Sequence, residues 1–379
     1  MEQSELVSII MPNYNGQPYI SKSIESVLSQ SYKNFEFIII DDASTDDSWN
    51  TIEGYDDCRI RAERLPKNEH ICYALNYGLK IAKGNYIARI DNDDCWEPEK
   101  LQKQIDFLRT HPDYGACFTW VTIVDELDNE LTEKETDRAK LFHVRNRSQT
   151  EWIRHFFFNG SCLCHPSAVM TRNAIEEVGE YDYGLVQIQD FDMWVRIAKR
   201  FPIHIIEEPL TRYRWTSSGD NLSAPSASVN NRSSYEFYSV ISHYFDDISD
   251  ELFLKAFSKD MIRKDAQSHE EILCEQALLL LRPLFCGYAQ KLGGMDRLKK
   301  LLGNEKTRKL LREKYGVTQK NFYELSASPV FYEHVSSITV DDFGSKDLLK
   351  ALIKKIIKPI PGLLKLLQKI KSLVSDLKQ

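Results

Sequence analysis

Three short apolar runs near the start of the chain each end in a polar or acidic segment. The runs cover residues 6–11, 35–40 and 85–90, and the segments that follow them are Pro12–Asn15, Asp41–Ser44 and Asp91–Asp94. Continuous apolar runs of this length are typical of strands that a parallel sheet buries on both faces. Stretches with the apolar spacing of helices lie between them. This alternation predicts an α/β fold, a doubly wound layer built on a mostly parallel sheet.

The remaining sequence divides into segments of different character. Further strands are predicted over 60–65, 115–124, 167–171, 203–207 and 210–215, and helices over 71–83, 151–158 and 190–199. We expect Gly84 to close the first of these helices in the left-handed conformation. Residues 217–234 are rich in Ser, Asn and Pro, which predicts a loop, and a helical pattern follows from Tyr235 to about Leu325. The sequence thus predicts an α/β domain over 1–222, a helical accessory region over 223–345 and a basic tail over 346–379.

The charge of the chain is unevenly distributed. Its net charge is −7, yet residues 346–379 carry nine lysines and only two aspartates. The acidic remainder argues against nucleic acid as a partner. In the tail, lysines lie opposite a stripe of Leu and Ile, which favours binding to an anionic membrane surface, with docking on the protein's own core as the alternative. Because the sequence shows neither a spanning segment nor a signal peptide, we expect a cytoplasmic protein held peripherally at the inner face of the cell membrane.

The acidic segments after the predicted strands point to a metal site. The carboxyl ends of parallel strands meet at one edge of a sheet, so Asp41, Asp42 and the acids of Asp91–Asp94 converge there. Such a cluster is unfavourable unless a cation or hydrogen-bond donors offset it. Oxygen ligands without a His or Cys set select Mg²⁺ or Mn²⁺, ions that commonly bridge carboxylates to substrate phosphates. We therefore expect a nucleotide diphosphate ligand; the alternative is that these acids only cap helices and turns.

The order of motifs along the chain resembles inverting glycosyltransferases of family 2. The matching segments are Ser8–Asn15, Ile40–Asp46, Gly84–Asp94, His165–Ser167, Gly179–Asp182 and Gln189–Trp194. The resemblance covers about residues 5–222 and implies the GT-A fold, a nucleotide-sugar-binding fold. It also implies roles for single residues on the donor side. Asp42 would pair with the base amide, Pro12, Asn13 and Tyr14 would shape the nucleoside pocket, Asp91 would lie near the ribose, and Asp93 would ligate the Mn²⁺ or Mg²⁺ that holds the donor diphosphate.

On the acceptor side, the resemblance makes Asp190 the general base that removes the proton from the attacking hydroxyl. The family commonly has Glu before this base, and this chain has Gln189. Three further residues are candidates for acceptor or phosphate contacts, namely His165, Arg212 and Arg214. The Gln-x-x-Arg-Trp signature of processive synthases is absent, since Arg212–Trp215 stands near its place without the Gln. The resemblance therefore favours transfer of a single sugar over polymerisation.

Together these features predict an enzyme of the hexosyltransferase type, acting in polysaccharide biosynthesis. It would move one sugar from a nucleotide-diphosphate sugar, foremost a UDP-sugar, to a hydroxyl of a glycan or lipid-linked saccharide acceptor. Two alternatives stay open at this point. A nucleotidyltransferase would need a glycine-rich phosphate loop, which the sequence lacks. A nucleotide-binding scaffold without catalysis would have no use for both Asp93 and Asp190.

Overall fold

The computed structural model describes residues 5–132, 138–216, 226–282, 285–286 and 288–327. Residues 1–323 form one compact unit, and residues 324–379 form a second. The basic tail predicted over 346–379 lies outside the described residues. Within the part of the chain that is described, no helix is both long and apolar enough to cross a bilayer.

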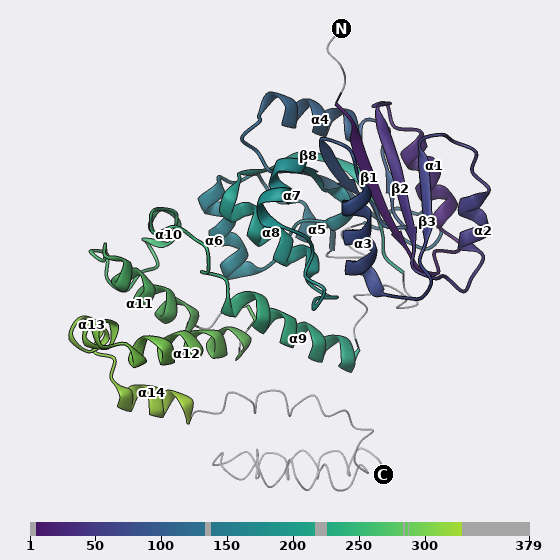
Figure 1. Ribbon diagram of the computed structural model, residues 1–379. Helices are drawn as coiled ribbons and strands as arrows, with labels where there is room; N and C mark the ends of the chain where they lie inside the picture. Colours follow the sequence, from purple (N-terminus) through teal and green to yellow (C-terminus); the bar gives the residue numbers. More distant parts are fainter. Residues whose placement is uncertain (1–4, 133–137, 217–225, 283–284, 287, 328–379) are drawn as a thin grey trace, which may run out of the picture. The chain divides into compact units, whose positions relative to one another are not determined.

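An eight-stranded sheet, mostly parallel, forms the centre of the first unit (Figure 1). Its strands are β1 (Val7–Asn13), β2 (Phe35–Asp41), β3 (Ile60–Arg64), β4 (Tyr86–Arg89), β5 (Cys95–Trp96), β6 (Ala116–Val124), β7 (Val169–Thr171) and β8 (Ile203–Arg214). Their order across the sheet is β3-β2-β1-β4-β7-β6-β8-β5. The pairs β3-β2, β2-β1, β1-β4 and β6-β8 are parallel, while β7 is antiparallel to both of its neighbours and β5 to β8. The mixed α/β fold with a mostly parallel sheet is therefore confirmed.

Helices cover both faces of the sheet. Those of the sheet region are α1 (Ile20–Leu28), α2 (Ser48–Glu53), α3 (His70–Ile81), α4 (Lys100–Thr110), α5 (Arg138–Phe142), α6 (Gln149–Asn159), α7 (Arg172–Val178) and α8 (Gln189–Arg200). Successive residues of a strand point to opposite faces. Accordingly, Ile10 packs in one core with α3, α6 and α8, and Ile9 packs in another with α1, α2 and α4. Figure 1 shows α3 on one side of β1 and β2 and α1 on the other.

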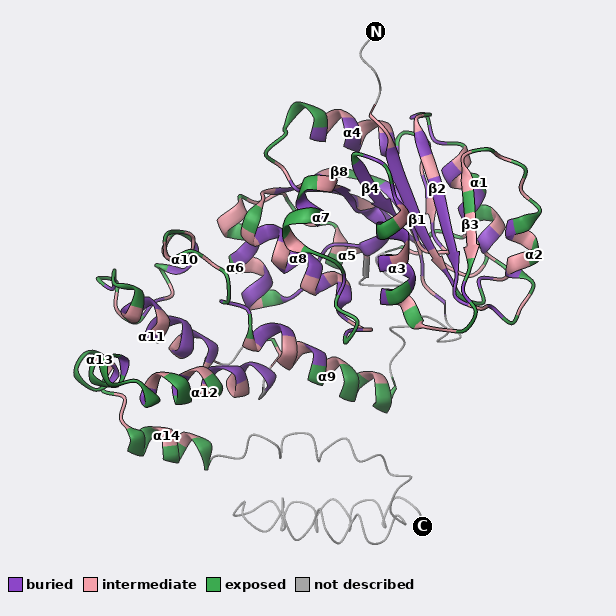
Figure 2. Cartoon of the chain, viewed as in Figure 1, coloured by how far each residue is buried: buried purple, intermediate pink, exposed green. Residues whose placement is uncertain are grey.

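A helical region follows β8. It comprises α9 (Ala227–Ser242), α10 (Asp250–Phe257), α11 (His269–Leu280), α12 (Tyr288–Gly303), α13 (Glu305–Tyr315) and α14 (Gln319–Ser326). Its aromatic side chains join the core of the sheet region: the ring centroid of Phe157 in α6 lies 5.2 Å from that of Tyr244 and 5.4 Å from that of Phe257. Figure 2 shows buried faces on α9, α11 and α12, whereas α14 has no buried residue. The first helices of this region are thus packed on the sheet domain through a shared apolar core.

Three local predictions were wrong. Helix α3 ends at Ile81, and the residue that caps it, Ala82, is extended. Gly84 is needed instead for close approach, because a Cβ there would lie 2.4 Å from the backbone nitrogen of Ser8. The two strands expected over 203–215 are one strand, β8, whose pairing with β6 shifts register on either side of Trp120. The second half of the loop predicted over 217–234 belongs to α9, which Ser226 caps by accepting from the backbone N–H of Val229. Strand β5 and helices α5 and α7 were not predicted.

Candidate active site

A cavity of about 420 Å³ opens at the carboxyl ends of β1, β2 and β4. Eight of the ten predicted site residues line it: Pro12, Asn13, Tyr14, Asp42, Asp91, Asp93, His165 and Asp190. They come from five separate segments of the chain, as expected where parallel strands end at one edge of a sheet. Arg212 and Arg214 do not line it. The structure thus brings the predicted donor residues and the predicted base into one cavity.

The side chain of Asn13 ties three loops together beneath this cavity. Its Nδ2 lies 2.7 Å from Asp41 Oδ1, and 3.1 Å from the hydroxyl oxygens of both Ser44 and Ser48. Its Oδ1 accepts from Asn92 Nδ2 at 2.7 Å. Since Asn13 is only 1% exposed, these bonds are shielded from water and fix the ends of β1, β2 and β4 relative to one another. We read Asn13 as shaping the pocket through these loops.

The loop after β2 carries the next donor-side candidate. Asp42 is buried, and its Oδ1 accepts from the backbone N–H of Glu69 at 2.7 Å, which joins this loop to the start of α3. Tyr14 is exposed at the mouth of the cavity. Ala43, which follows Asp42, and His70, which follows Glu69, have φ of 59° and 67°, the left-handed conformation that non-glycine residues rarely occupy. Backbone strain therefore gathers at this edge of the sheet.

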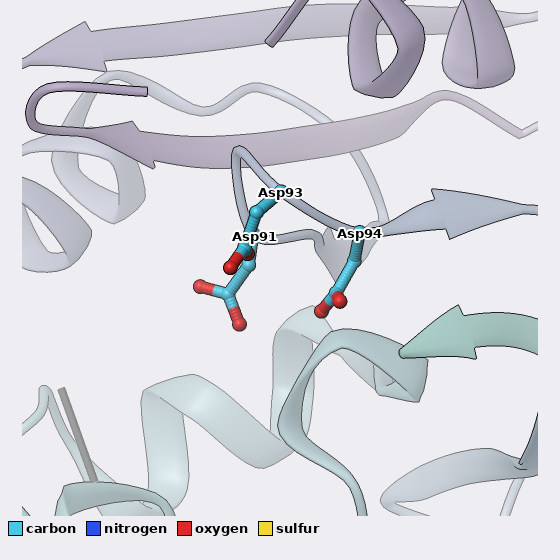
Figure 3. Close-up of side chains that lie close together, drawn as sticks. All are labelled: Asp91, Asp93 and Asp94. Atoms are coloured by element: carbon cyan, nitrogen blue, oxygen red, sulfur yellow. The ribbon is translucent and has the colours of Figure 1, made fainter. Parts of the chain in front are cut away.

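Three carboxylates project to the same side of the loop after β4 (Figure 3). Ligand oxygens of Asp91, Asp93 and Asp94 all lie within 4.8 Å of one another. The buried guanidinium of Arg89 forms a two-pronged ion pair with Asp91, with Nη1 at 2.5 Å from Oδ2. This ion pair compensates the negative charge of Asp91, so the charges of Asp93 and Asp94 need another source of compensation.

Burial and mutual repulsion raise the pKa values of the remaining two acids. The pKa of Asp93 rises to about 7, first because of desolvation and then because of the neighbouring charge of Asp91. The pKa of Asp94 is also raised well above its usual value, by burial and by Asp93. Asp94 Oδ2 is buried and has no hydrogen-bond partner among the described residues. A divalent cation would supply the missing positive charge, so the oxygen ligands present fit Mg²⁺ or Mn²⁺.

Arg214, the last residue of β8, fixes the backbone of this acidic loop. Its backbone N–H donates to Asp94 Oδ1 at 2.7 Å, and its Nε donates to the carbonyl of Asp93 at 2.8 Å. The guanidinium also contacts Asp128 and the ring of Tyr19, 4.3 Å from the ring centroid. Arg212, two residues before it, pairs with Glu130 at 2.9 Å. Both arginines therefore have protein partners outside the cavity.

Asp190 lies in the first turn of α8. Its Oδ1 accepts from the backbone N–H of Phe191 at 2.7 Å, and Ile188, not Asp190, occupies the N-cap position. Desolvation raises the pKa of Asp190 to about 6. A carboxylate with this pKa accepts a proton more readily than an ordinary aspartate and is still ionised at neutral pH. The nearby Asp192 is paired with Arg196 at 2.8 Å, so its charge is already compensated.

His165 lies on the wall of the cavity next to Asp190's helix. The residue is 7% exposed, and its Nε2 lies 3.0 Å from the hydroxyl of Tyr181. Burial, together with the charge of Arg89, holds the pKa of His165 well below its usual value. The imidazole is therefore neutral at physiological pH, and it can orient a hydroxyl but carries no charge toward a phosphate.

Sequence reasoning gave no role to four residues that shape the site. Arg89 pairs with Asp91, Asn92 holds Asn13, and Gln187 lines the cavity. Glu236, on α9, contacts the segment before Asp190. A signal existed for Arg89, a charged residue at the end of the apolar run 85–90. Nothing in the sequence links Glu236 to a segment about fifty residues earlier.

Comparison with known proteins identifies the family. Residues 8–179 match the model of glycosyl transferase family 2. An uncharacterised glycosyltransferase of Methanocaldococcus jannaschii is 32% identical over 244 residues, which cover 63% of this chain and 79% of that protein. The Escherichia coli protein WfaP, a UDP-Glc:alpha-D-GlcNAc-diphosphoundecaprenol beta-1,3-glucosyltransferase, is 48% identical over 106 residues, 28% of this chain and 42% of WfaP.

Among solved structures, S. aureus TarS 1–349 in complex with UDP-GlcNAc resembles this fold. The TM-score is 0.52 at 17% sequence identity, with 78% of this chain and 86% of the TarS chain covered. At this identity the likeness shows the fold alone, and it agrees with the GT-A fold expected from the motifs. The match to the family model and the relatives above establish that this chain is a glycosyltransferase and belongs to glycosyltransferase family 2.

Proposed function

We propose that the protein is an inverting hexosyltransferase that moves one sugar from a UDP-sugar to a hydroxyl of a lipid-linked saccharide. One observation carries the proposal: Asp190, with its pKa raised to about 6, lines the same cavity as Asp42, Asp91 and Asp93. A single space thus holds groups suited to bind a nucleotide diphosphate and a group suited to accept a proton. Neither a nucleotidyltransferase nor a scaffold would need the proton-accepting group.

On the donor side, we assign the residues as their places in the cavity suggest. Asp42 would accept a hydrogen bond from the base, with Pro12, Asn13 and Tyr14 bounding the nucleoside. Asp91 would lie near the ribose, and Asp93 would hold Mn²⁺ or Mg²⁺ together with Asp94. When bound, such an ion would neutralise charge on the donor diphosphate. Arg214 would act indirectly, by fixing the backbone of Asp93 and Asp94.

The transfer step is a direct displacement at the anomeric carbon. The acceptor oxygen forms a bond to that carbon as its proton passes to the Asp190 carboxylate. The bond from the same carbon to the β-phosphate oxygen breaks, and its electron pair leaves with the nucleoside diphosphate. Attack from the face opposite the leaving group inverts the carbon. His165, neutral and held by Tyr181, would orient the acceptor hydroxyl next to the base.

The acceptor class rests on the relatives and on the tail. WfaP is named for a diphosphoundecaprenol-linked acceptor, and its match covers 28% of this chain. An acceptor of that class lies at a membrane surface, and the lysines of residues 346–379 would bring the enzyme to anionic lipid, adding about 1 kcal/mol each near the surface. We propose accordingly that residues 1–222 bind donor and acceptor, that 223–345 support them, and that 346–379 hold the protein at the membrane.

A donor screen tests the proposed function. Purified full-length protein is incubated with UDP- and GDP-sugars and Mn²⁺, with and without a diphospholipid-linked GlcNAc, and the release of UDP or GDP is followed. We expect metal-dependent release of one nucleoside diphosphate, faster with acceptor and absent from Asp190→Asn protein that still binds UDP. Release of pyrophosphate would indicate a nucleotidyltransferase, and tight binding without turnover would indicate a scaffold.

Vesicle sedimentation tests the tail separately. Full-length protein should sediment with vesicles that contain phosphatidylglycerol at low salt, and protein lacking residues 346–379 should stay in the supernatant. Full-length protein that does not bind these vesicles would contradict the anchoring role of the tail, and it would leave the proposed sugar transfer unaffected.

A further inference from the structure

Helix α9 of the helical region contacts the segment that leads into Asp190. The side chain of Glu236, only 1% exposed, reaches the backbone of residues 186–188. Its Oε1 accepts from the N–H of Val186 at 3.0 Å, and its Oε2 accepts from the N–H groups of Gln187 at 2.7 Å and Ile188 at 3.0 Å. One carboxylate therefore fixes three consecutive peptide units directly before α8.

These three amides are the means by which the buried charge of Glu236 is compensated. Among the described residues, Glu236 has no ion pair with a Lys, Arg or His. Hydrogen bonds from backbone N–H groups to a carboxylate are charge-assisted and about twice as strong as neutral ones. Breaking them would leave a buried carboxylate and three backbone N–H groups, that of the buried Ile188 among them, without these partners, so the segment and the helix are strongly coupled.

Phe237, the next residue of α9, packs against Phe191, the residue that follows Asp190. The ring centroid of Phe237 lies 6.1 Å from that of Phe191, and both rings approach Phe285, at 5.5 and 6.5 Å. Phe191 directly follows Asp190 in the chain. Residues 236–237 thus contact the backbone before Gln189 and the side chain after Asp190, so the two residues between them are held from both sides.

The segment of residues 186–190 presents polar groups to the cavity. Val186, Gln187, Gln189 and Asp190 all line it. Gln187 Nε2 and Gln189 Oε1 are buried, yet neither has a hydrogen-bond partner among the described residues. One is a donor and the other an acceptor, a pair that matches a sugar hydroxyl, which both donates and accepts. Buried polar atoms without partners are rare in folded proteins, and a bound ligand is one way to satisfy them.

We propose that Glu236 is a positioning residue for sugar transfer, which holds residues 186–188 so that Gln187, Gln189 and Asp190 face the hydroxyl-bearing acceptor. This inference rests on the proposed function for its chemistry. It gives the helical region a part in the reaction, through one carboxylate. A reacting group misplaced by about 1 Å can lose 10²-fold in rate, so loosening this segment should lower turnover while nucleotide binding by the loops after β1, β2 and β4 persists.

The test compares two substitutions of the same kind. Glu236→Gln keeps the shape of the side chain but turns an amide NH₂ toward backbone donors. Glu275→Gln is the matched control, because Glu275 on α11 is likewise 1% exposed and accepts two backbone N–H groups, from Ile262 at 2.7 Å and Arg263 at 2.8 Å. Glu275 does not line the cavity. Both variants should lose stability, but only the first should lose turnover.

Two readouts keep this inference separate from the proposed function. With UDP-glucose and Mn²⁺, or the UDP-sugar that the donor screen selects, we expect Glu236→Gln to lower kcat about 10-fold or more and to change the dissociation constant of UDP less than about 2-fold. Hydrogen exchange should show faster exchange at residues 186–188 in this variant and not in Glu275→Gln. Should Glu236→Gln not fold, Glu236→Asp, which keeps the charge on a shorter side chain, should show the same changes at smaller size.

Equal turnover in Glu236→Gln and wild type, or equal loss in both Glu variants, would overturn the positioning role. Unchanged exchange at residues 186–188 would overturn the contact itself. A wild-type protein that turns over no nucleotide sugar would instead count against the proposed function, and the exchange measurement would still decide whether Glu236 fixes this segment.

Discussion

Replacing Asp190 by Asn should make the protein more stable at neutral pH, although it removes the proposed base. Desolvation raises the pKa of Asp190 from 3.8 to about 6. A raised carboxyl pKa means that the folded state disfavours the charged form, so this group destabilises the fold once the pH exceeds both values. Asn keeps the side-chain oxygen that accepts from the N–H of Phe191 and carries no charge.

The size of the effect follows from the pKa difference. A difference of about 2 pKa units corresponds to ~3 kcal/mol above pH 6. Because the Asp190 side chain is only partly buried, solvent screening reduces this, and we expect a gain of ~1–3 kcal/mol at pH 7.5. At pH 5 the folded carboxyl is mostly protonated while the unfolded one is mostly ionised, so the gain should fall to roughly half its value at pH 7.5.

Thermal unfolding of both proteins between pH 5 and 7.5, in EDTA and without nucleotide, measures this dependence. We expect the melting temperature of Asp190→Asn to exceed that of wild type by about 2–5 °C at pH 7.5, with a smaller excess at pH 5. Asp113→Asn, which removes a carboxylate at an exposed position, is measured alongside as the control for the loss of one charge. An excess that stays constant with pH would refute the raised pKa, and with it the claim that this site is built to hold a stronger base.

Three further predictions concern the reaction and the fold. With saturating Mn²⁺, kcat/KM for the donor should be flat above pH ~6 and fall about tenfold per pH unit below it, because Asp190 must be ionised; a flat profile down to pH 5 would exclude it as base. Asp93→Ala should reduce UDP affinity in Mn²⁺ to the metal-free value in calorimetry, and unchanged affinity would place the ion elsewhere. Gly84→Ala should cost ~1–3 kcal/mol, since its Cβ would meet the Ser8 nitrogen at 2.4 Å, whereas Gly303→Ala, with nothing within 4 Å, should be neutral in urea unfolding.

The sheet and its edge could be predicted because their signals are local. Residues 6–11, 35–40 and 85–90 are apolar runs followed by acids or amides, and the structure places strands within two residues of these bounds. The predictions failed where contacts with segments distant in the sequence determine the local structure. Gly84 has the residue type of a helix cap, but the closeness of β1 sets its role. Residues 227–234 look like a loop, yet they form the first half of α9 because Ser226 caps it and the core fixes its later turns.

The same distinction applies to the site. Asp42, Asp93 and Asp190 each sit in a motif of a few residues, so the sequence alone could propose them, and the cavity brings them together. Their supports come from far along the chain. Arg214 reaches Asp94 across 120 residues, and Glu236 reaches Val186 across 50. No periodicity or spacing reports such pairs, since they depend on the finished topology.

Because Arg214 in β8 holds the acidic loop after β4, these two segments must be kept together when part of this chain is transferred into a relative. The family model ends at residue 179, and a fragment cut there would keep Asp42 and the whole acidic loop but would lose Asp190 and the strand end that grips that loop. A fragment cut after β8 would regain both and still lack Glu236. A segment exchanged between relatives that is to carry the acidic loop, Asp190 and the contacts that hold both therefore runs from β1 through α9.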